Sequence, residues 1–253
     1  MEVCRAPERP EMDQAQFDAL RTKTLEVHNR LVRVFGTPSR TGHLDPVSEL
    51  VSAILSQNTS DVNRDRAYRR LRARLPTWEA VRDADVREVR EAIRPAGLSE
   101  IKAPRIQEAL RRITQPDGHP SLDCLRHMNV EEARNWLMGI KGVGPKTAAI
   151  ILLFSMGRPA FPVDTHIHRV TKRLALIGPR ASREQAHDIL ERLVPPELYY
   201  PFHINMIRHG REVCRPQPRC EVCVLRDLCC YYAACVQGTA TGEEKAAVCE
   251  TGP

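Results

Sequence analysis

Apolar residues recur along this chain at helical spacing, and the alternation typical of strands is missing. The stretch DPVSELVSAILSQN places its apolar residues on one helix face: Val47, Leu50, Val51, Ile54 and Leu55. Asp45 precedes the stretch as an N-cap, and Pro46 occupies the first helical position, where no amide hydrogen is needed. The pattern therefore predicts a helix that begins at Pro46 and buries one face.

The same start signals return further along the chain. Asn129 with Glu132, and Ser182 with Gln185, have the spacing of a capping box, and an apolar stripe follows each pair. Connections between such segments are short and rich in proline and glycine, as in RPAG and QPDGHP. We therefore expect an all-α protein of about ten helices.

Composition narrows the choice of partners and compartment. The 253 residues are 42% apolar and 28% charged, which is typical of a globular protein, and the formal charge of +6 permits a polyanionic partner. The longest apolar run, Ala148 to Phe154, is too short to cross a bilayer, so we expect no membrane partner. Residues 1–16 do not resemble a signal peptide. We expect an intracellular protein, cytoplasmic and associated with the nucleoid if its source is bacterial.

Four cysteines lie close together near the C-terminus, at Cys214, Cys220, Cys223 and Cys229, with five, two and five residues between them. Thiols so grouped in an intracellular protein favour a bound metal, either tetrahedral zinc or an iron–sulfur cluster. Structural zinc usually uses two paired CxxC motifs, and this stretch has one, so the spacing favours 4Fe–4S. Unligated loop thiols are the alternative, and Cys230 is a competing fourth ligand.

A second motif is the turn in LMGIKGVGPKTAAIILLF. Gly142 and Gly144 permit backbone angles and close approaches that a side chain would prevent, and Pro145 then begins a helix. The amides from Val143 to Lys146 would face outward at the positive end of that helix, where a phosphate can bind. A tight turn between packed helices is the alternative that the glycines alone favour.

Taken together, LMGIKGVGPKTA, VDTHIHRV and the run HGREVC with its later cysteines resemble the endonuclease III family of DNA glycosylases. The resemblance covers roughly residues 15–230, with three motifs in the family's order. It implies a helix–hairpin–helix whose Lys141, Gly142, Val143 and Gly144 contact the DNA backbone. It also implies one 4Fe–4S cluster on the four cysteines. The five residues between Cys214 and Cys220 are one fewer than the family usually has.

The resemblance also implies catalytic residues. Lys146 would be the nucleophile, whose uncharged amine attacks C1′ of the damaged nucleotide and forms a Schiff base that permits β-elimination. Asp164 would stabilise the positive charge that develops on the sugar or assist proton transfer. The sequence around Asp164, taken alone, favours an N-cap over a catalytic role.

A target nucleotide must leave the base stack before its C1′ can react, and protein side chains fill the gap. By resemblance, Gln57 or Asn58 would fill it from one loop, and Leu98 would act as an apolar wedge from another. Ser99 follows Leu98 where the family often has an aromatic residue. Arginines of the cysteine segment, Arg215, Arg219 and Arg226, are candidates to meet phosphates.

The expected organisation has four parts. Residues 1–44 form an N-terminal segment that packs with the cluster domain, 45–157 a six-helix barrel with the hairpin, 158–230 the cluster domain and 231–253 a flexible tail. The expected protein is a monomer that binds double-stranded DNA with damaged bases or abasic sites. It would remove oxidised pyrimidines and cleave the strand. The alternatives are a monofunctional mismatch glycosylase, an electron-transfer protein and a non-catalytic iron–sulfur DNA-binding protein.

Overall fold

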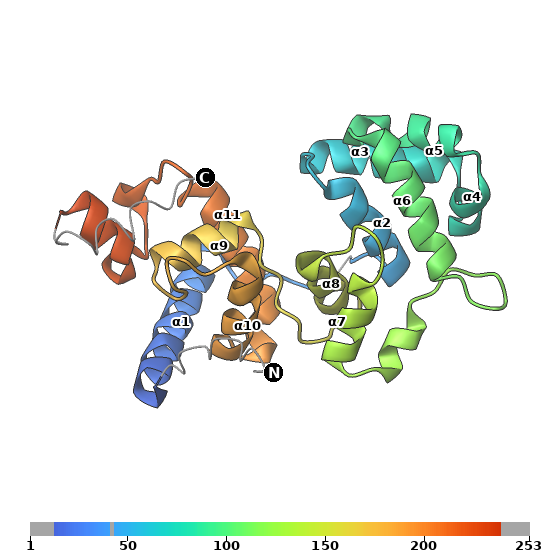
Figure 1. Ribbon diagram of the computed structural model, residues 1–253. Helices are drawn as coiled ribbons and strands as arrows, with labels where there is room; N and C mark the ends of the chain where they lie inside the picture. The colour runs from blue at the N-terminus through green and yellow to red at the C-terminus, as the bar shows by residue number, and fades with distance from the viewer. Residues whose placement is uncertain (1–12, 41–42, 239–253) are drawn as a thin grey trace, which may run out of the picture. The chain divides into compact units, whose positions relative to one another are not determined.

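The computed structural model describes residues 13–40 and 43–238 (Figure 1). These residues form eleven α-helices joined by short 3-10 and π-helical turns, and their β-structure is limited to one isolated bridge between Thr114 and Pro120. The all-α prediction is confirmed. No helix in these ranges is long and apolar enough to cross a lipid bilayer. Of the predicted tail, residues 239–253 lie outside the described chain, as do residues 1–12.

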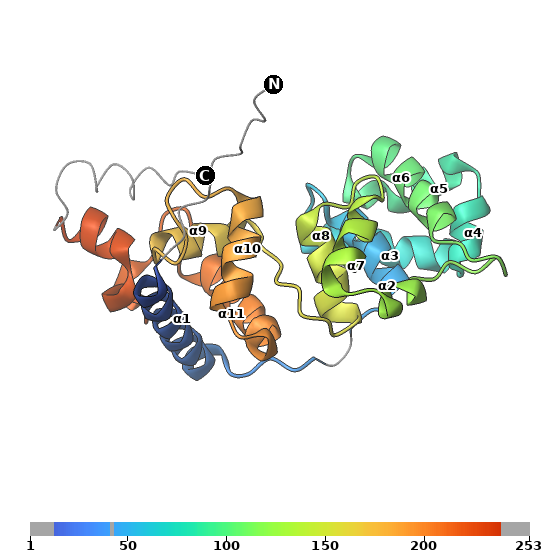
Figure 2. The same ribbon diagram turned by 60° about the horizontal axis from the view of Figure 1, so that its bottom comes forward.

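The described chain divides into two compact units (Figure 2). One unit joins the residues up to Ser39 with those from Val163 onward, and the other is Arg40–Pro162. The N-terminal helix therefore belongs to the same unit as the cysteine segment, although most of the chain separates them in sequence.

The Arg40–Pro162 unit contains seven of the described α-helices: α2 (Pro46–Ser56), α3 (Asp61–Arg74), α4 (Trp78–Asp83), α5 (Val86–Ile93), α6 (Ser99–Arg112), α7 (Val130–Met138) and α8 (Pro145–Ile150). Its core consists of apolar side chains with no exposed surface, among them Leu50, Ile54, Leu71, Ile93, Ile106 and Leu110. Burial of each such side chain contributes about 1.5–3 kcal/mol.

The predicted helix starts are confirmed in this unit. The Asp45 carboxylate accepts hydrogen bonds from the amides of Val47 and Ser48, at 3.1 and 3.0 Å. Asn129 and Glu132 form the reciprocal capping box at the start of α7. Each cap supplies partners for amides that the first helical turn cannot satisfy internally.

Helix α8 does not run regularly through the apolar stretch that follows it. It passes into a π-helical turn at Ile151–Ser155, where the amide of Met156 reaches back to the carbonyl of Ile151 at 3.3 Å. Hydrophobic periodicity gives no sign of this turn, because the residues at its start are all apolar and buried.

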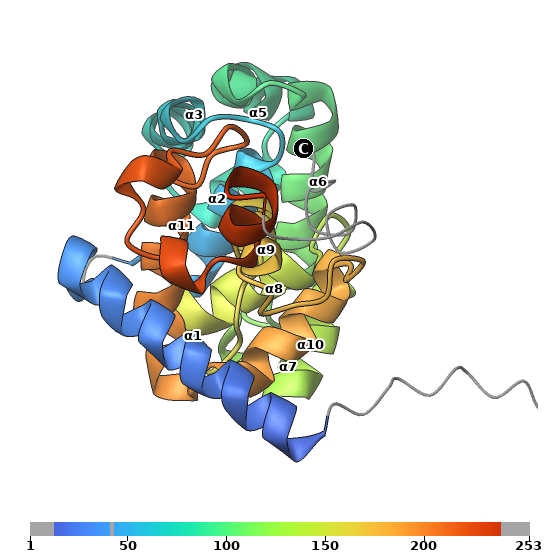
Figure 3. The same ribbon diagram turned by 90° about the vertical axis from the view of Figure 1, so that its left-hand side faces the viewer.

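The other unit contains α1 (Gln14–Phe35), α9 (Thr165–Arg173), α10 (Arg183–Leu193) and α11 (Tyr199–Glu212). Helix α1 packs against α10 and α11 (Figure 3). Two side chains of α11 fix the chain just after α1. The Asn205 amide donates to the Gly36 carbonyl at 2.9 Å, and the Tyr200 hydroxyl donates to the Ser39 carbonyl at 2.8 Å.

The cysteine segment follows α11 and is built from short turns, Cys220–Val222, Arg226–Leu228 and the π-helical turn Tyr232–Val236. Arg30 of α1 holds this segment, because its guanidinium donates to the Val224 carbonyl at 3.0 Å and pairs with the Asp227 carboxylate. The N-terminal helix therefore supports the cysteine segment directly.

Candidate functional site

The glycine turn between α7 and α8 has two glycines with different backbone requirements. Gly142 has φ of 89°, a value that favours glycine, and the Arg105 side chain lies 3.4 Å from where a Cβ would stand. Gly144 has an extended backbone, with φ of −99°, and a Cβ there would meet no atom within 4 Å. The turn itself therefore requires glycine at 142, whereas Gly144 leaves open space beside the backbone.

Lys146 stands in the first turn of α8, directly after this hairpin, and is exposed, as is Lys141. Gly144 is the N-cap, and no side chain caps the helix. The amides of this first turn are therefore available to another acceptor. The hairpin thus combines a helix start that no side chain caps with two exposed lysines.

Glu49 of α2 is a titratable neighbour of Lys146 that the sequence analysis missed. Its carboxyl is half-buried, and this burial raises its pKa, against the opposing effect of the positive charges of Arg64 and Lys146. An acidic residue in a first helical turn ordinarily serves the helix dipole, so nothing in the sequence marked this one.

The two candidate gap-filling residues after α2 are held differently. The Gln57 side chain is half-buried and donates to the Gly142 carbonyl at 2.7 Å, which ties the loop to the hairpin. Asn58 is exposed and has φ of 52°, in the left-handed region. Asn58 is therefore the one with a side chain directed to solvent on a conformationally restricted backbone.

Leu98 shares both properties with Asn58. It is 51% exposed and has φ of 49°, immediately before α6. Exposed leucines are common, but the left-handed conformation is rare outside glycine, asparagine and aspartate. The structure thus places an exposed apolar side chain on a strained backbone at the predicted wedge position.

Asp164 lies in the other unit, at the N-terminus of α9. Its carboxylate accepts a hydrogen bond from the Ile167 amide at 2.8 Å, so the capping prediction is confirmed. Two histidines follow in the first turn: His166 accepts from Arg169 at 3.1 Å, and the His168 ring lies 2.8 Å from the Ala181 carbonyl. Burial lowers the pKa of both histidines.

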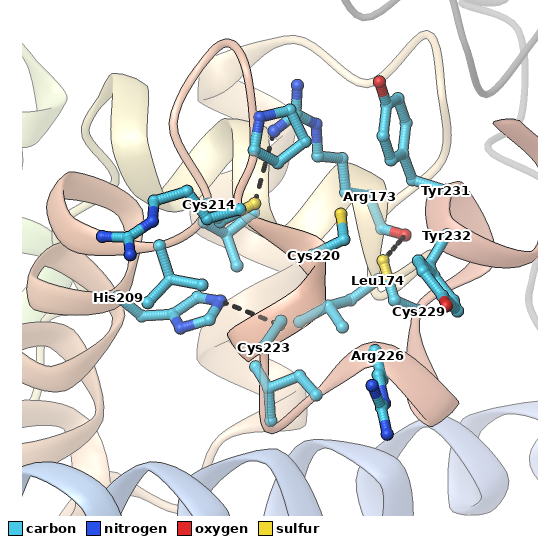
Figure 4. Close-up of a pocket in the computed structure, with 15 residues that line it drawn as sticks. Arg173, Leu174, His209, Cys214, Cys220, Cys223, Arg226, Cys229, Tyr231 and Tyr232 are labelled. Atoms are coloured by element: carbon cyan, nitrogen blue, oxygen red, sulfur yellow. Dashed lines mark hydrogen bonds between the residues drawn. The ribbon is translucent and has the colours of Figure 1, made fainter. Parts of the chain in front are cut away.

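The predicted cysteines Cys214, Cys220, Cys223 and Cys229 line one cavity (Figure 4). Burial raises the pKa of the Cys220 and Cys223 thiols, and that of Cys229 to about 11. In the described part of the chain, no three histidine, cysteine or acidic side chains stand close enough to share a single metal ion. The four thiols therefore line the same cavity, but no three of them are close enough to bind one common ion.

Two basic side chains at this cavity were not singled out from the sequence. Arg173 is buried and donates to the Cys214 sulfur at 3.4 Å, and its guanidinium lies 4.5 Å from the centre of the Tyr231 ring (Figure 4). His209 is also buried, 3.8 Å from the Cys223 sulfur, and burial lowers its pKa to about 4. Their roles depend on the packing of α9 and α11, which no local sequence pattern reveals.

Cys230, the competing ligand, does not line this cavity. Its sulfur lies 3.8 Å from the Lys23 ammonium, which also donates to the Leu174 carbonyl. The arginines of the segment, Arg215, Arg219 and Arg226, are all exposed.

The helical fold, the glycine hairpin and the cavity lined by four thiols are the features expected of the endonuclease III family of DNA glycosylases. The model of the HhH-GPD superfamily, described as base excision DNA repair proteins, matches residues 51–196. Endonuclease III of Thermotoga maritima is 33% identical over 208 residues, which cover 82% of this chain and 92% of that protein. The chain therefore belongs to the HhH-GPD superfamily and is similar to endonuclease III.

Two further comparisons extend this result. The solved structure of a trapped covalent intermediate between endonuclease III and DNA matches with a TM-score of 0.69 and 28% identity, over 83% of this chain and 95% of that one. A protein of Arabidopsis thaliana, described as a candidate DNA glycosylase, is 37% identical over 162 residues. These residues cover 64% of this chain, which spans only 55% of that relative.

Proposed function

We propose that this protein is a bifunctional DNA glycosylase and AP lyase, which removes oxidised pyrimidines from double-stranded DNA and cleaves the strand. The observation that carries the proposal is the exposed amine of Lys146 in the first turn of α8, directly after the hairpin. A relative captured as a covalent protein–DNA intermediate supports the same chemistry.

In this proposal the Lys146 amine attacks C1′ of the damaged nucleotide. The bond between C1′ and the base breaks, and the base departs with the bonding electrons and gains a proton. Opening of the sugar then gives a Schiff base between Lys146 and C1′. Loss of a C2′ proton expels the 3′ phosphate by β-elimination, and water releases the lysine.

Asp164 would act on the sugar while the base departs. A carboxylate near the sugar stabilises the positive charge that develops there, and it can also accept a proton in the later steps. Because its carboxylate already accepts from the Ile167 amide, its position is fixed by the start of α9.

The space left by the extruded nucleotide would be filled by Asn58 and Leu98. Both side chains are exposed and both backbones are left-handed. Gln57 is the weaker candidate, because its amide is engaged by the Gly142 carbonyl. The hairpin residues from Lys141 to Gly144 would hold the DNA backbone through amides and a lysine.

The thiol cavity fits a 4Fe–4S cluster, which binds each cysteine through a separate iron and so suits four thiols spread around one space. Cys214, Cys220, Cys223 and Cys229 would hold it. When bound, such a cluster provides a structural cross-link and a redox-active centre. The cysteine segment would then direct the side chains of Arg215, Arg219 and Arg226 toward DNA phosphates.

The substitution Lys146→Gln tests the proposal. It keeps the hairpin and a side chain of similar length but removes the amine. We expect binding to a duplex with an abasic site to persist, borohydride-trapped adducts to disappear, and strand cleavage to fall by about a thousandfold or more.

Lys141→Gln is the matched control, because it removes the same charge from another exposed lysine of the hairpin. It should weaken DNA binding and leave trapping intact. Persistent trapping in Lys146→Gln would show that another amine is the nucleophile. A panel of duplexes, each with one lesion, then identifies the preferred base. Excision of mispaired adenine or thymine without trapping would instead favour the monofunctional alternative.

A further inference from the structure

Lys102 is a lysine in the interior of the Arg40–Pro162 unit. It lies in the first turn of α6 and is 1% exposed, and this burial lowers the pKa of its ammonium group. Lysines are almost never so fully buried without a partner. The partners here are backbone carbonyls: the ammonium donates to Leu55 and to Ala96, at 2.8 Å in each case.

Both carbonyls lie at the end of a helical segment. Leu55 is in the last turn of α2, and Ala96 ends the 3-10 turn Arg94–Ala96. Carbonyls at such ends lack partners within their own helix and carry the negative end of its dipole. One ammonium group therefore satisfies the ends of two segments and holds them to α6.

Each of the two segments ends two residues before a left-handed residue of the candidate site. Asn58 comes three residues after Leu55, and Leu98 comes two residues after Ala96. The backbone amide of Lys102 also donates to the Leu98 carbonyl, at 2.9 Å. The Leu98 contact is the ordinary backbone bond of the helix start, whereas the Lys102 side chain bonds the segments that precede both candidate residues.

We propose that Lys102 is a positioning residue that fixes the spacing of the loops of Asn58 and Leu98, so that both side chains enter the gap left by the extruded nucleotide. This role rests on the proposed function. Positioning matters here because a displacement of about 1 Å at a reacting site can lower a rate by about a hundredfold.

The chain offers a matched control in the same helix. Gln107 of α6 is 3% exposed, and its side-chain amide donates to the carbonyls of Val81 and Ala84 at 3.0 and 2.8 Å. It therefore also joins α6 to the end of another helix, α4, but not to either loop. Lys102→Met and Gln107→Met each leave buried carbonyls without a donor.

The test compares borohydride trapping at an abasic site in duplex DNA with trapping at the same site in a single strand, where no opposite base or gap exists. For Lys102→Met we expect the duplex rate to fall about tenfold or more, and the single-strand rate by less than about threefold. For Gln107→Met both rates should change by the same factor. Lys102→Gln, which keeps an amide donor on a shorter and uncharged side chain, should fall between wild type and Lys102→Met.

A second measurement reads the gap directly. With 2-aminopurine opposite the abasic site, insertion of the protein side chains changes its fluorescence. Saturating wild-type protein should produce the change, and Lys102→Met a change about tenfold smaller. Urea unfolding of each variant identifies any that fail to fold, in which case Lys102→Gln supplies the comparison.

The two ideas fail in different ways. Wild-type protein that traps neither substrate would overturn the proposed function, and with it the role of Lys102. Wild-type trapping, together with an unchanged duplex-to-single-strand ratio in Lys102→Met or Lys102→Gln, would overturn the positioning role alone and leave Lys102 as a core residue like Gln107.

Discussion

Asp164 has a capping role in the structure and a proposed chemical role, and two substitutions separate them. Asparagine caps helices about as well as aspartate. Asp164→Asn should therefore leave the free energy of unfolding nearly unchanged, while turnover of a lesion duplex falls about a hundredfold. Trapping at preformed abasic sites should persist, because the Lys146 amine remains. Urea unfolding and borohydride trapping measure the two effects.

Asp164→Ala is the control for the cap. It removes the acceptor of the Ile167 amide and should lower the free energy of unfolding by about 1 kcal/mol. Full turnover in Asp164→Asn would mean that the carboxylate serves α9 alone.

Adjacent cysteines provide a second test at the level of single residues. Cys229 lines the thiol cavity, whereas the Cys230 sulfur lies beside Lys23. We expect Cys230→Ser to keep its iron and sulfide, and Cys229→Ser to lose much of both. Metal and sulfide analysis of the purified variants measures this. Loss of iron in Cys230→Ser alone would show that Cys230 is the fourth ligand in place of Cys229. Zinc without sulfide in the wild-type protein would contradict a 4Fe–4S cluster.

Glu49 should make stability depend on pH. Because burial raises its pKa, the folded protein holds this proton more tightly than the unfolded chain does. Stability therefore falls as pH rises above the ordinary value of 4.5, until the folded-state carboxyl is ionised. Glu49→Gln removes this loss, so its advantage in free energy of unfolding over wild type should grow from pH 4.5 toward neutrality.

Urea unfolding of both proteins across this range measures the difference. If the glutamine variant is instead less stable than wild type at neutral pH, Arg64 and Lys146 stabilise the carboxylate by more than its burial disfavours it.

At the scale of elements, the two glycines of the hairpin allow its effect on folding to be tested separately from its effect on DNA binding. Gly142 has φ of 89°, so Gly142→Ala should lower the free energy of unfolding by about 1–2 kcal/mol. Gly144 is extended with open space at the Cβ position, so Gly144→Ala should fold normally. We nevertheless expect it to weaken binding to an abasic duplex, since the methyl group would stand where we propose that a phosphate approaches. Unchanged affinity in Gly144→Ala would exclude that close approach.

The sequence predicted the helix starts, which depend on neighbouring residues. It did not predict contacts between residues that are far apart in the chain. Asp45 and Asn129 cap amides only a few residues away, so their positions were legible in the sequence. The bond that distinguishes Gln57 from Asn58 spans 85 residues, and the sequence left both candidates open. Lys102 similarly looks like a surface charge until α2 and α6 are packed together.

The cysteine motif was the most legible part of the candidate site. Its spacing alone predicted the four thiols that line the cavity. The buried Arg173 beside Cys214 was not predicted, because it comes from α9, 41 residues earlier in the chain. The spacing of residues within one segment cannot predict side chains that reach a site from another element.

At the scale of the whole molecule, the two units carry different parts of the proposed chemistry. The hairpin, Lys146 and both gap-filling candidates belong to Arg40–Pro162, and Asp164 and the cysteines to the other unit. The formal charge of +6 counts cysteines as neutral. Four thiolates around a cubane of charge +2 would lower it to about +4, so the protein would remain basic.

A basic protein that contacts DNA mainly through phosphates should bind less tightly as salt rises, because each contact releases counterions. Lys141→Gln should flatten the plot of log affinity against log salt concentration by about one unit. Arg21→Gln is the control, since Arg21 is exposed on α1 and its loss changes the net charge equally. Titration of a duplex with an abasic site at several salt concentrations measures both slopes. Equal flattening in the two variants would mean that the slope follows net charge, and that Lys141 does not contact a phosphate.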